Sequence, residues 1–182
     1  MFADGTDNWL ARLKAWENRM AVRINRANSR HILSAFFGVV SSLGDGLFWY
    51  ALMAALLLYQ GPDALKPVLV MVAAGMACTF TYTWLKSTTS RERPCRQHPG
   101  IRVTTLPLDY YSFPSGHTLH AVCFTVVAAT YYPALWALLL PFTLLVAASR
   151  LILGLHYLSD VIAGALIGGT LALAALYLAG FI

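Results

Sequence analysis

The chain has 182 residues, of which 58% are hydrophobic and only 12% are charged, with a mean hydropathy of +0.61 and a formal net charge of +5. This composition excludes an ordinary soluble domain, in which about a quarter of the residues are charged. It indicates one compact membrane protein with little room for a second domain. The positive charge indicates an acidic partner. Membrane phosphate explains it more simply than nucleic acid, because the chain has no recognised nucleic-acid-binding motif.

The first 30 residues are expected to form an amphipathic helix at the membrane surface. Apolar side chains recur there at helical spacing, and a stripe of arginines lies beside them. The segment contains acidic residues and no continuous apolar run, which argues against a cleavable signal peptide. The pattern favours a helix lying on anionic lipid, and the alternative is a solvated helix that packs on a partner. The apolar residues are Trp9, Leu13, Trp16, Met20 and Ile24, and the arginines are Arg12, Arg19, Arg23, Arg26 and Arg30.

Apolar segments fill most of the remaining chain and predict an all-α integral membrane bundle of about six transmembrane helices. The first two segments are shorter than the roughly 20 residues that a bilayer crossing usually needs. Glycine-containing breaks at 44–46 and 61–63 separate the first three segments. The expected spans are 31–43, 46–60, 66–86, 115–132, 134–152 and 156–180.

Residues 87–113 form the one long polar connection, and a loop of this length in a small protein usually has a function. It contains Cys95, whereas Cys78 and Cys123 lie in apolar stretches and are expected to be buried. An odd cysteine count with two members inside the membrane argues against a disulfide framework. The loop arginines expected to be solvated or to contact lipid headgroups are Arg91, Arg96 and Arg102.

Three short stretches carry the candidate chemistry. They read Lys-x6-Arg-Pro at 86–94, Pro-Ser-Gly-His at 114–117, and Ser-Arg-x5-His-x3-Asp at 149–160. Counting the expected spans places all three stretches on the same side of the membrane. The alternation of helices would therefore assemble one site from three distant motifs.

Basic side chains near a bilayer are costly and usually mark function. Three of them, converging in a folded bundle, would neutralise an anion with several oxygens, and phosphate is the obvious candidate. They are Lys86, Arg93 and Arg150. Taken alone, Lys86 could simply extend to the membrane interface from the end of its helix.

Asp160 follows His156 by four residues, so that on a helix both side chains would share a face. The carboxylate could accept a proton from one ring nitrogen and leave the other free to attack. In isolation, the pair could equally be a structural histidine held by a hydrogen bond.

The Pro-Ser-Gly-His motif predicts a helix start suited to an anion. Ser115 can cap the helix, Gly116 lets the backbone approach closely, and a helix amino terminus offers free N–H groups. His117 would then be placed to protonate a leaving oxygen. The alternative is an ordinary capped helix start. Asp45, between two glycines, is expected to have a structural role, either capping the second apolar segment or contacting loop arginines. His120 is expected to have a packing or supporting role, and His98 has no assigned role.

Together, the three motifs resemble the three-part signature of the type 2 phosphatidic acid phosphatase superfamily, which includes membrane lipid phosphatases and soluble vanadium haloperoxidases. The resemblance covers residues 86–160 at motif level. It implies that His156 attacks phosphorus and forms a phosphohistidine, that Asp160 orients it, and that His117 donates a proton to the leaving group and later helps activate water. The groups implied to hold the phosphoryl oxygens are Lys86, Arg93, Arg150 and the amides of Ser115 and Gly116.

The resemblance implies no cofactor. A metal is also disfavoured, because cations stand where metal ligands would be needed and the one carboxylate is committed to His156. The sequence therefore predicts a phosphatase domain over 31–182, preceded by the interfacial segment 1–30, that hydrolyses a membrane lipid phosphate. Phosphatidic acid, phosphatidylglycerophosphate, undecaprenyl diphosphate and lipid A phosphates all remain candidate substrates.

Two alternatives remain open: a lipid phosphotransferase, and a non-catalytic lipid-binding or transport protein of the same fold, against which the intact His117, His156 and Asp160 argue. A haloperoxidase is disfavoured, because those relatives are soluble and this chain has membrane spans. The oligomeric state is not indicated by the sequence. The compact chain favours a bacterial inner membrane. The expected spans place the amino terminus and the 61–66 turn opposite the site, and these regions contain six basic residues before His31 as well as Lys66. The positive-inside rule then predicts a site that faces the periplasm or exterior.

Overall fold

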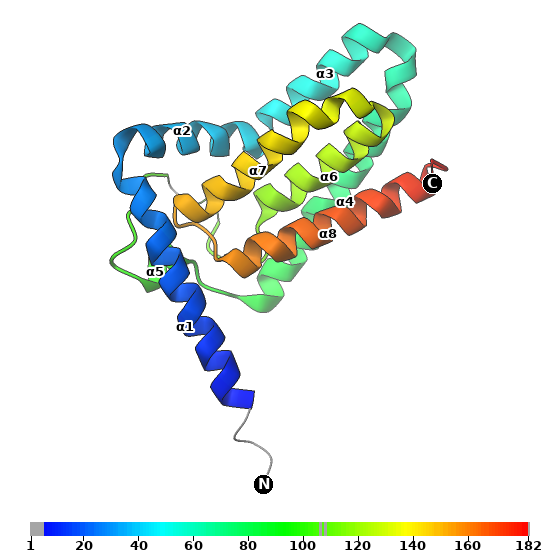
Figure 1. Cartoon of the computed structure of the whole chain (residues 1–182). Helices are drawn as coiled ribbons and strands as arrows, with labels where there is room; N and C mark the ends of the chain where they lie inside the picture. Colours follow the sequence, from blue (N-terminus) through cyan, green and yellow to red (C-terminus); the bar gives the residue numbers. More distant parts are fainter. Residues whose placement is uncertain (1–5, 106, 108, 182) are drawn as a thin grey trace.

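The computed structural model describes residues 6–105, 107 and 109–181, so residues 1–5 of the expected interfacial segment lie outside the described part. Within that part the protein is helical, with one isolated bridge between Glu92 and Tyr111 as its only β pairing (Figure 1). The expected all-α class is confirmed. The elements are α1 (Thr6–Asn25), η1 (Arg26–Ser29), α2 (His31–Ser42), η2 (Leu43–Leu47), α3 (Phe48–Gln60), η3 (Gly61–Ala64), α4 (Leu65–Thr89), α5 (Pro94–Gln97), α6 (Gly116–Tyr131), η4 (Pro133–Leu135), α7 (Trp136–Ile152) and α8 (Leu158–Leu178).

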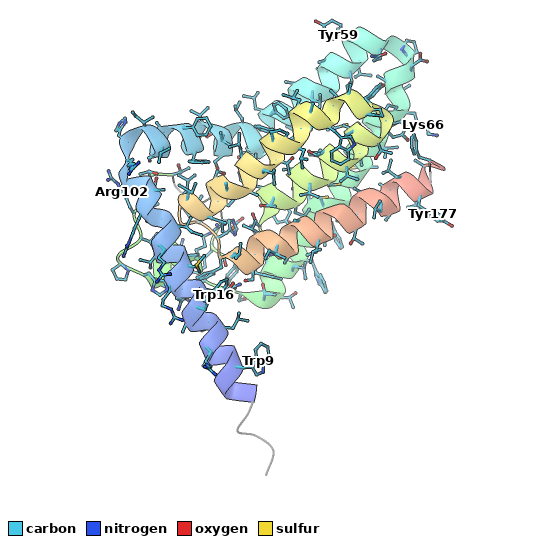
Figure 2. The ribbon with its side chains drawn as sticks, viewed as in Figure 1. Trp9, Trp16, Tyr59, Lys66, Arg102 and Tyr177 are labelled. Atoms are coloured by element: carbon cyan, nitrogen blue, oxygen red, sulfur yellow. The ribbon has the colours of Figure 1, made fainter. Side chains whose placement is uncertain are left out.

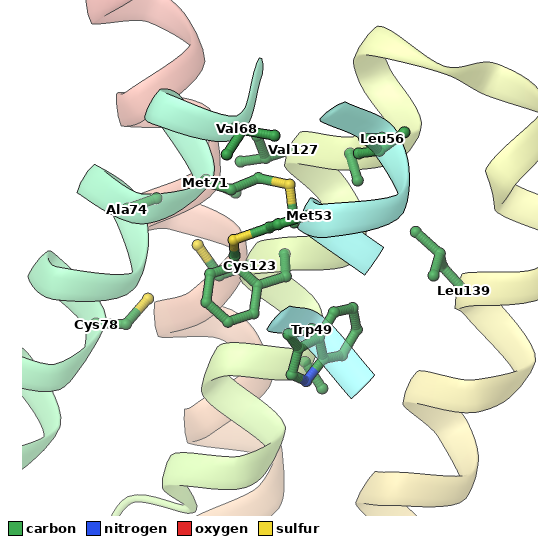
Figure 3. Packing of buried hydrophobic residues seen from close by; sticks show 14 of the residues in the cluster. Trp49, Met53, Leu56, Val68, Met71, Ala74, Cys78, Cys123, Val127 and Leu139 are labelled. Carbon is green, nitrogen blue, oxygen red and sulfur yellow. The ribbon is translucent and has the colours of Figure 1, made fainter. Parts of the chain in front are cut away.

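An apolar core joins four helices that are distant in sequence. Trp49 and Met53 of α3 face Met71 of α4, Val127 of α6 and Leu139 of α7, all of them buried (Figure 3). Lipid tails are as apolar as these side chains, so in a membrane such a cluster is held by close packing more than by exclusion of water. The packing aligns α4, α6 and α7, whose ends carry the three motifs.

Small residues bring α6 and α8 into backbone contact. A Cβ atom added at Gly168 would lie 2.2 Å from the Leu119 carbonyl oxygen, and one at Gly164 would lie 2.6 Å from the Ser115 carbonyl oxygen. Only glycine fits at these two positions. The close approach lets the Ser115 N–H donate to the Asp160 carbonyl at 3.0 Å. The second motif therefore lies directly against the third.

The segment from α2 to α3 is one bent helix and not a pair of antiparallel spans. Gly46 has a φ of 123° within η2, and the chain bends there without reversing, so that α3 leads away from α1 (Figure 1). With 12 and 13 residues, α2 and α3 are each roughly 20 Å long, less than the roughly 30 Å of bilayer hydrocarbon. The expected six spans are not confirmed. The described stretches that are long and apolar enough to cross a membrane are His31–Thr89, Pro133–Ile152 and Leu158–Leu178.

This bend changes the position of the amino terminus. Asn25 of α1 donates hydrogen bonds to the carbonyls of Ile152, at 2.9 Å, and Arg102, at 3.1 Å. Lys66 and Tyr177 lie at the opposite end of the bundle (Figure 2). The prediction that the amino-terminal segment lies opposite the three motifs is therefore wrong. It took the bend at Gly46 for a turn between two antiparallel spans, which added one crossing too many. The charge argument for an outward-facing site loses its basis with it.

Candidate active site

One cavity of about 860 Å³ collects side chains from all three motifs. It lies among α3, α4 and α6, at the end where α7 passes into α8. Two of the predicted site residues, Ser115 and Asp160, are fully buried and stand outside its wall. The predicted site residues that line it are Lys86, Arg93, Gly116, His117, Arg150 and His156.

The three predicted cations are almost fully removed from solvent. Lys86, Arg93 and Arg150 are 8%, 1% and 3% exposed. Arg150 donates to the hydroxyl of Ser41, and its Nε has no hydrogen-bond partner among the described residues. Buried cations are destabilising unless they are paired. The arrangement is therefore suited to binding an anion with several oxygens.

Asp109, which sequence reasoning did not select, pairs with two of these cations. Its Oδ1 lies 2.6 Å from Nη2 of Arg93, and its Oδ2 contacts Nζ of Lys86. Partial burial would raise the pKa of Asp109, but the two cations outweigh burial and hold that pKa below its ordinary value. Asp109 is the only acidic residue from Arg93 to Phe113. The loop 87–113 has one other acid, the exposed Glu92. A carboxylate standing apart from the motif, in the basic stretch after Arg93, was the signal that could have found Asp109.

His156 lies in the turn before α8, so the interpretation that it shares a helix face with Asp160 is wrong. Asp160 stands in the first turn of α8, where its Oδ2 accepts the Tyr157 N–H at 2.8 Å. Gly154, with a φ of 71°, provides the left-handed residue in the tight connection from α7. The turn still brings His156 Nδ1 within 3.7 Å of Asp160 Oδ2.

The partners of His156 define its tautomer. Nη1 of Arg93 lies 3.0 Å from His156 Nε2 and also donates to the Leu155 carbonyl at 2.8 Å. A guanidinium can only donate, so Nε2 carries the lone pair and the proton is assigned to Nδ1, which faces Asp160. Burial, reinforced by the neighbouring cations Arg93 and Arg150, holds the pKa of His156 well below its ordinary value. The imidazole is therefore neutral at pH 7, with Nε2 able to act as a nucleophile.

His117 faces the cavity from the first turn of α6, with its Nε2 at 3.3 Å from Asp45 Oδ1. Asp45 was expected to cap a helix or contact loop arginines, but it lies at the bend between α2 and α3 and contacts this histidine instead. His120 makes supporting contacts with the Gly116 carbonyl at 2.9 Å and the Thr79 hydroxyl at 3.1 Å. Among the described residues, no three His, Cys, Asp or Glu side chains group closely enough to hold a metal ion.

Ser115 does not offer its amide to the cavity. Its N–H donates to the Asp160 carbonyl, and its hydroxyl lies 3.0 Å from the Thr118 hydroxyl. The expected contact between the Ser115 amide and a phosphoryl oxygen is therefore wrong. Gly116, the first residue of α6, does line the cavity.

Arg91 is not the solvated loop charge that was expected. It bridges Glu17 of α1 and Asp160 of α8. Residues two apart in an extended segment point the same way, so Arg91 follows Arg93 inward while Glu92 between them is exposed. This alternation was the signal available in the sequence.

Comparison with known proteins agrees with the motif resemblance. The model of the PAP2 superfamily matches residues 63–181. The chain belongs to the PAP2 superfamily. It is 36% identical, over 64% of its length, to decaprenylphosphoryl-5-phosphoribose phosphatase of Mycolicibacterium smegmatis, and 28% identical, over 88%, to lipid phosphate phosphatase delta of Arabidopsis thaliana. It spans 62% and 41% of those two proteins.

Two solved PAP2 structures have the same fold. The crystal structure of Aquifex aeolicus LpxE superposes with a TM-score of 0.75 and 28% identity, over 87% of this chain and 93% of that one. A transmembrane PAP2-type phosphatidylglycerolphosphate phosphatase from Bacillus subtilis gives a TM-score of 0.75 at 22% identity, over 93% of this chain and 87% of that one. The fold is therefore that of transmembrane PAP2 proteins, and the chain is an integral membrane protein.

Proposed function

We propose that this PAP2 protein is a membrane lipid phosphate phosphatase that works through a phosphohistidine intermediate. The observation that carries the proposal is the composition of the 860 Å³ cavity. Its polar end holds the three buried cations, three histidines and the carboxylates of Asp45 and Asp109, and the remainder is lined mainly by apolar side chains. A phosphorylated lipid has this same division between a charged head and an apolar chain.

In the first half-reaction, Nε2 of His156 attacks phosphorus and the bond from phosphorus to the lipid oxygen breaks. His117 enters this step in its protonated form, which the contact with the Asp45 carboxylate favours, and gives that proton to the departing oxygen. Lys86, Arg93 and Arg150 hold the phosphoryl oxygens, where the charge of the transition state is spread. Asp160 stabilises the imidazolium that forms on His156.

In the second half-reaction, water attacks the phosphohistidine. His117, now neutral, takes a proton from that water as the bond between phosphorus and Nε2 breaks. Inorganic phosphate leaves, and both histidines return to their starting forms.

The lipid chain is proposed to enter between α3 and α4. Tyr50 of α3 and Met76 and Phe80 of α4 line the cavity and are also 71%, 64% and 76% exposed on the outer surface. An opening bordered by exposed apolar side chains on membrane helices leads to lipid and not to water. This geometry favours long-chain substrates, among which undecaprenyl diphosphate and phospholipid phosphates remain the proposed class.

The function is tested by phosphate release from a panel of lipid phosphates, using purified protein in detergent. We expect release from at least one long-chain substrate, undiminished by EDTA and inhibited competitively by vanadate, which can adopt the five-coordinate geometry of the transferring group. Strict dependence on one divalent metal would contradict the mechanism. A labelled acceptor lipid distinguishes a phosphotransferase, and absence of both products would favour a non-catalytic lipid-binding protein.

Asp109 is expected to compete with the substrate for Lys86 and Arg93, because its carboxylate occupies two of the three cations. Replacing Asp109 by Asn should therefore lower the KI of inorganic phosphate and the KM of the lipid substrate by up to about tenfold, which corresponds to ~1.4 kcal/mol. Steady-state kinetics with phosphate as inhibitor measures both constants. Glu92→Gln, an exposed change in the same loop, is the matched control. An increase in KM would mean that Asp109 helps to hold the phosphoryl group.

We propose a bacterial inner membrane as the location, as both solved relatives come from bacteria. The outward orientation has lost its support from charge, so it is decided by labelling. Cys95 is half-buried in α5, whereas Cys78 and Cys123 are buried in the core. Reaction of Cys95 with a membrane-impermeant thiol reagent in intact spheroplasts places the site outside, and reaction only after permeabilisation places it in the cytoplasm. Cys95→Ser is the control for specific labelling.

A further inference from the structure

The amphipathic helix α1 contributes one carboxylate to the neighbourhood of the site. Glu17 is the only acidic residue between Asn8 and Gly44, and its side chain is 7% exposed. Its Oε2 lies 2.7 Å from Nη2 of Arg91, and its Oε1 accepts the N–H of Ser159 at 3.1 Å. A carboxylate is buried only when it is paired and hydrogen-bonded. Glu17 therefore fixes α1 to the loop and to the start of α8.

Arg91 extends this contact to Asp160, the candidate partner of the nucleophile His156. Its Nη1 lies 2.7 Å from Asp160 Oδ1 and donates to the Ser159 hydroxyl at 2.7 Å, while its guanidinium lies 4.3 Å from the centre of the Tyr157 ring. The planar fork thus spans two buried carboxylates, which a lysine ammonium cannot do with the same geometry. The other oxygen of Asp160 faces His156.

The position of α1 is set by further contacts and not by lipid alone. Asn25 donates to two carbonyls and accepts the Arg102 N–H at 2.7 Å, while Asn28 donates to the Arg102 carbonyl at 2.7 Å. Trp9 and Trp16 are exposed on an adjacent face of the helix (Figure 2). One face of α1 is therefore available to the membrane, while another is bound to the site.

We propose that Glu17 and Arg91 are positioning residues that hold Asp160 in place for its action on His156, so that α1 completes the active site. This inference rests on the proposed phosphatase function. Arg91 supplies the positive charge beside Asp160 and fixes the rotamer of its carboxylate. Glu17 fixes Arg91 from the other side. Neither residue touches the cavity, so both act through Asp160.

The test compares Glu17→Gln, Arg91→Lys and the double variant on the lipid phosphate that the wild type hydrolyses. Misplacing a catalytic group can cost up to about a hundredfold in rate. We expect kcat to fall about tenfold in Glu17→Gln and further, up to about a hundredfold, in Arg91→Lys, with KM within about twofold of wild type. The double variant should be no worse than Arg91→Lys, because both changes break the same chain of contacts. Glu92→Gln and Arg23→Gln, both exposed, should match the wild type.

Rates are expressed per vanadate-binding site, so that a loss of folded protein is not counted as a loss of kcat. If the decrease in kcat disappears on this scale, the positioning role is overturned. An increase in KM as large as the expected decrease in kcat would also overturn it. An independent measurement uses the ring ¹⁵N signals of His156 in labelled protein, assigned with His156→Gln. These signals should move in Glu17→Gln and Arg91→Lys but not in Glu92→Gln, and unmoved signals would also overturn it. If the wild type releases no phosphate, the proposed function fails, and the ¹⁵N signals still test the contact chain.

Discussion

His156→Ala should abolish phosphate release, lowering kcat by at least ~10⁴-fold, the scale at which loss of a nucleophile acts. The change removes the nitrogen that forms the covalent intermediate, and no neighbouring group can replace it. Arg93 lies on the same side of the ring but has no lone pair to offer. The measurement is single-turnover phosphate release from the preferred lipid, together with acid-labile ³²P labelling of the protein. We expect the wild type to be labelled and the variant to remain unlabelled.

His120→Ala is the matched control for this prediction. His120 lines the same cavity one helical turn after His117, and its two ring nitrogens contact Gly116 and Thr79. Its loss should leave the labelling of the protein intact. The variant His156→Ala should still bind vanadate, because the three cations remain. Near-normal turnover in His156→Ala would show that the nucleophile has been misassigned.

The convergence of the motifs could be predicted because it depends on the number and length of the helices between them. The apolar segments of the sequence indicate both. Lys86 closes a helix, His117 opens another, and Arg150 and His156 flank a turn, so consecutive helices bring them to one end. The amino terminus could not be placed in the same way. The glycines around Asp45 indicate a break, but only the backbone angles distinguish a bend from a reversal, and at Gly46 the chain bends.

The charged residues that the motifs identified, Lys86, Arg93 and Arg150, lie together in one cavity, whereas the contacts of charged residues outside the motifs were not predicted. Glu17 is the only acid between Asn8 and Gly44, and Asp109 is the only acid from Arg93 to Phe113. Both pair with arginines, Glu17 with one far away in the sequence and Asp109 with one across the loop. A count of net charge does not show which arginine each of these carboxylates will pair with. A lone carboxylate among arginines is more informative in a membrane protein, since an unpaired charge near the bilayer is costly.

Arg150→Met should separate function from stability more sharply than any other change in the site. Arg150 is 3% exposed, and the Ser41 hydroxyl is the only hydrogen-bond acceptor that the described side chains offer it. Removing its charge leaves no buried carboxylate unpaired, and replacing a buried ion by an apolar side chain of similar size is often neutral or stabilising. We therefore expect the Tm in detergent to stay the same or rise, while kcat/KM falls by ~10³-fold, comparable to losing a principal donor to the transition state.

Arg150→Lys and Arg102→Met complete this experiment. The lysine variant keeps a positive charge but loses the fork that can hold two phosphoryl oxygens, so its activity should lie between those of wild type and Arg150→Met. Arg102 is exposed in the loop. Its replacement should raise the KM of the lipid substrate and leave kcat unchanged. Arg150 has no carboxylate partner among the residues that the structure describes, so bound inorganic phosphate would supply the missing negative charge. We therefore expect phosphate to raise the Tm of the wild type and to leave that of Arg150→Met unchanged. A stabilised variant that hydrolysed lipid phosphate normally would remove Arg150 from the phosphate site, whereas a strongly destabilised one would assign it a structural role.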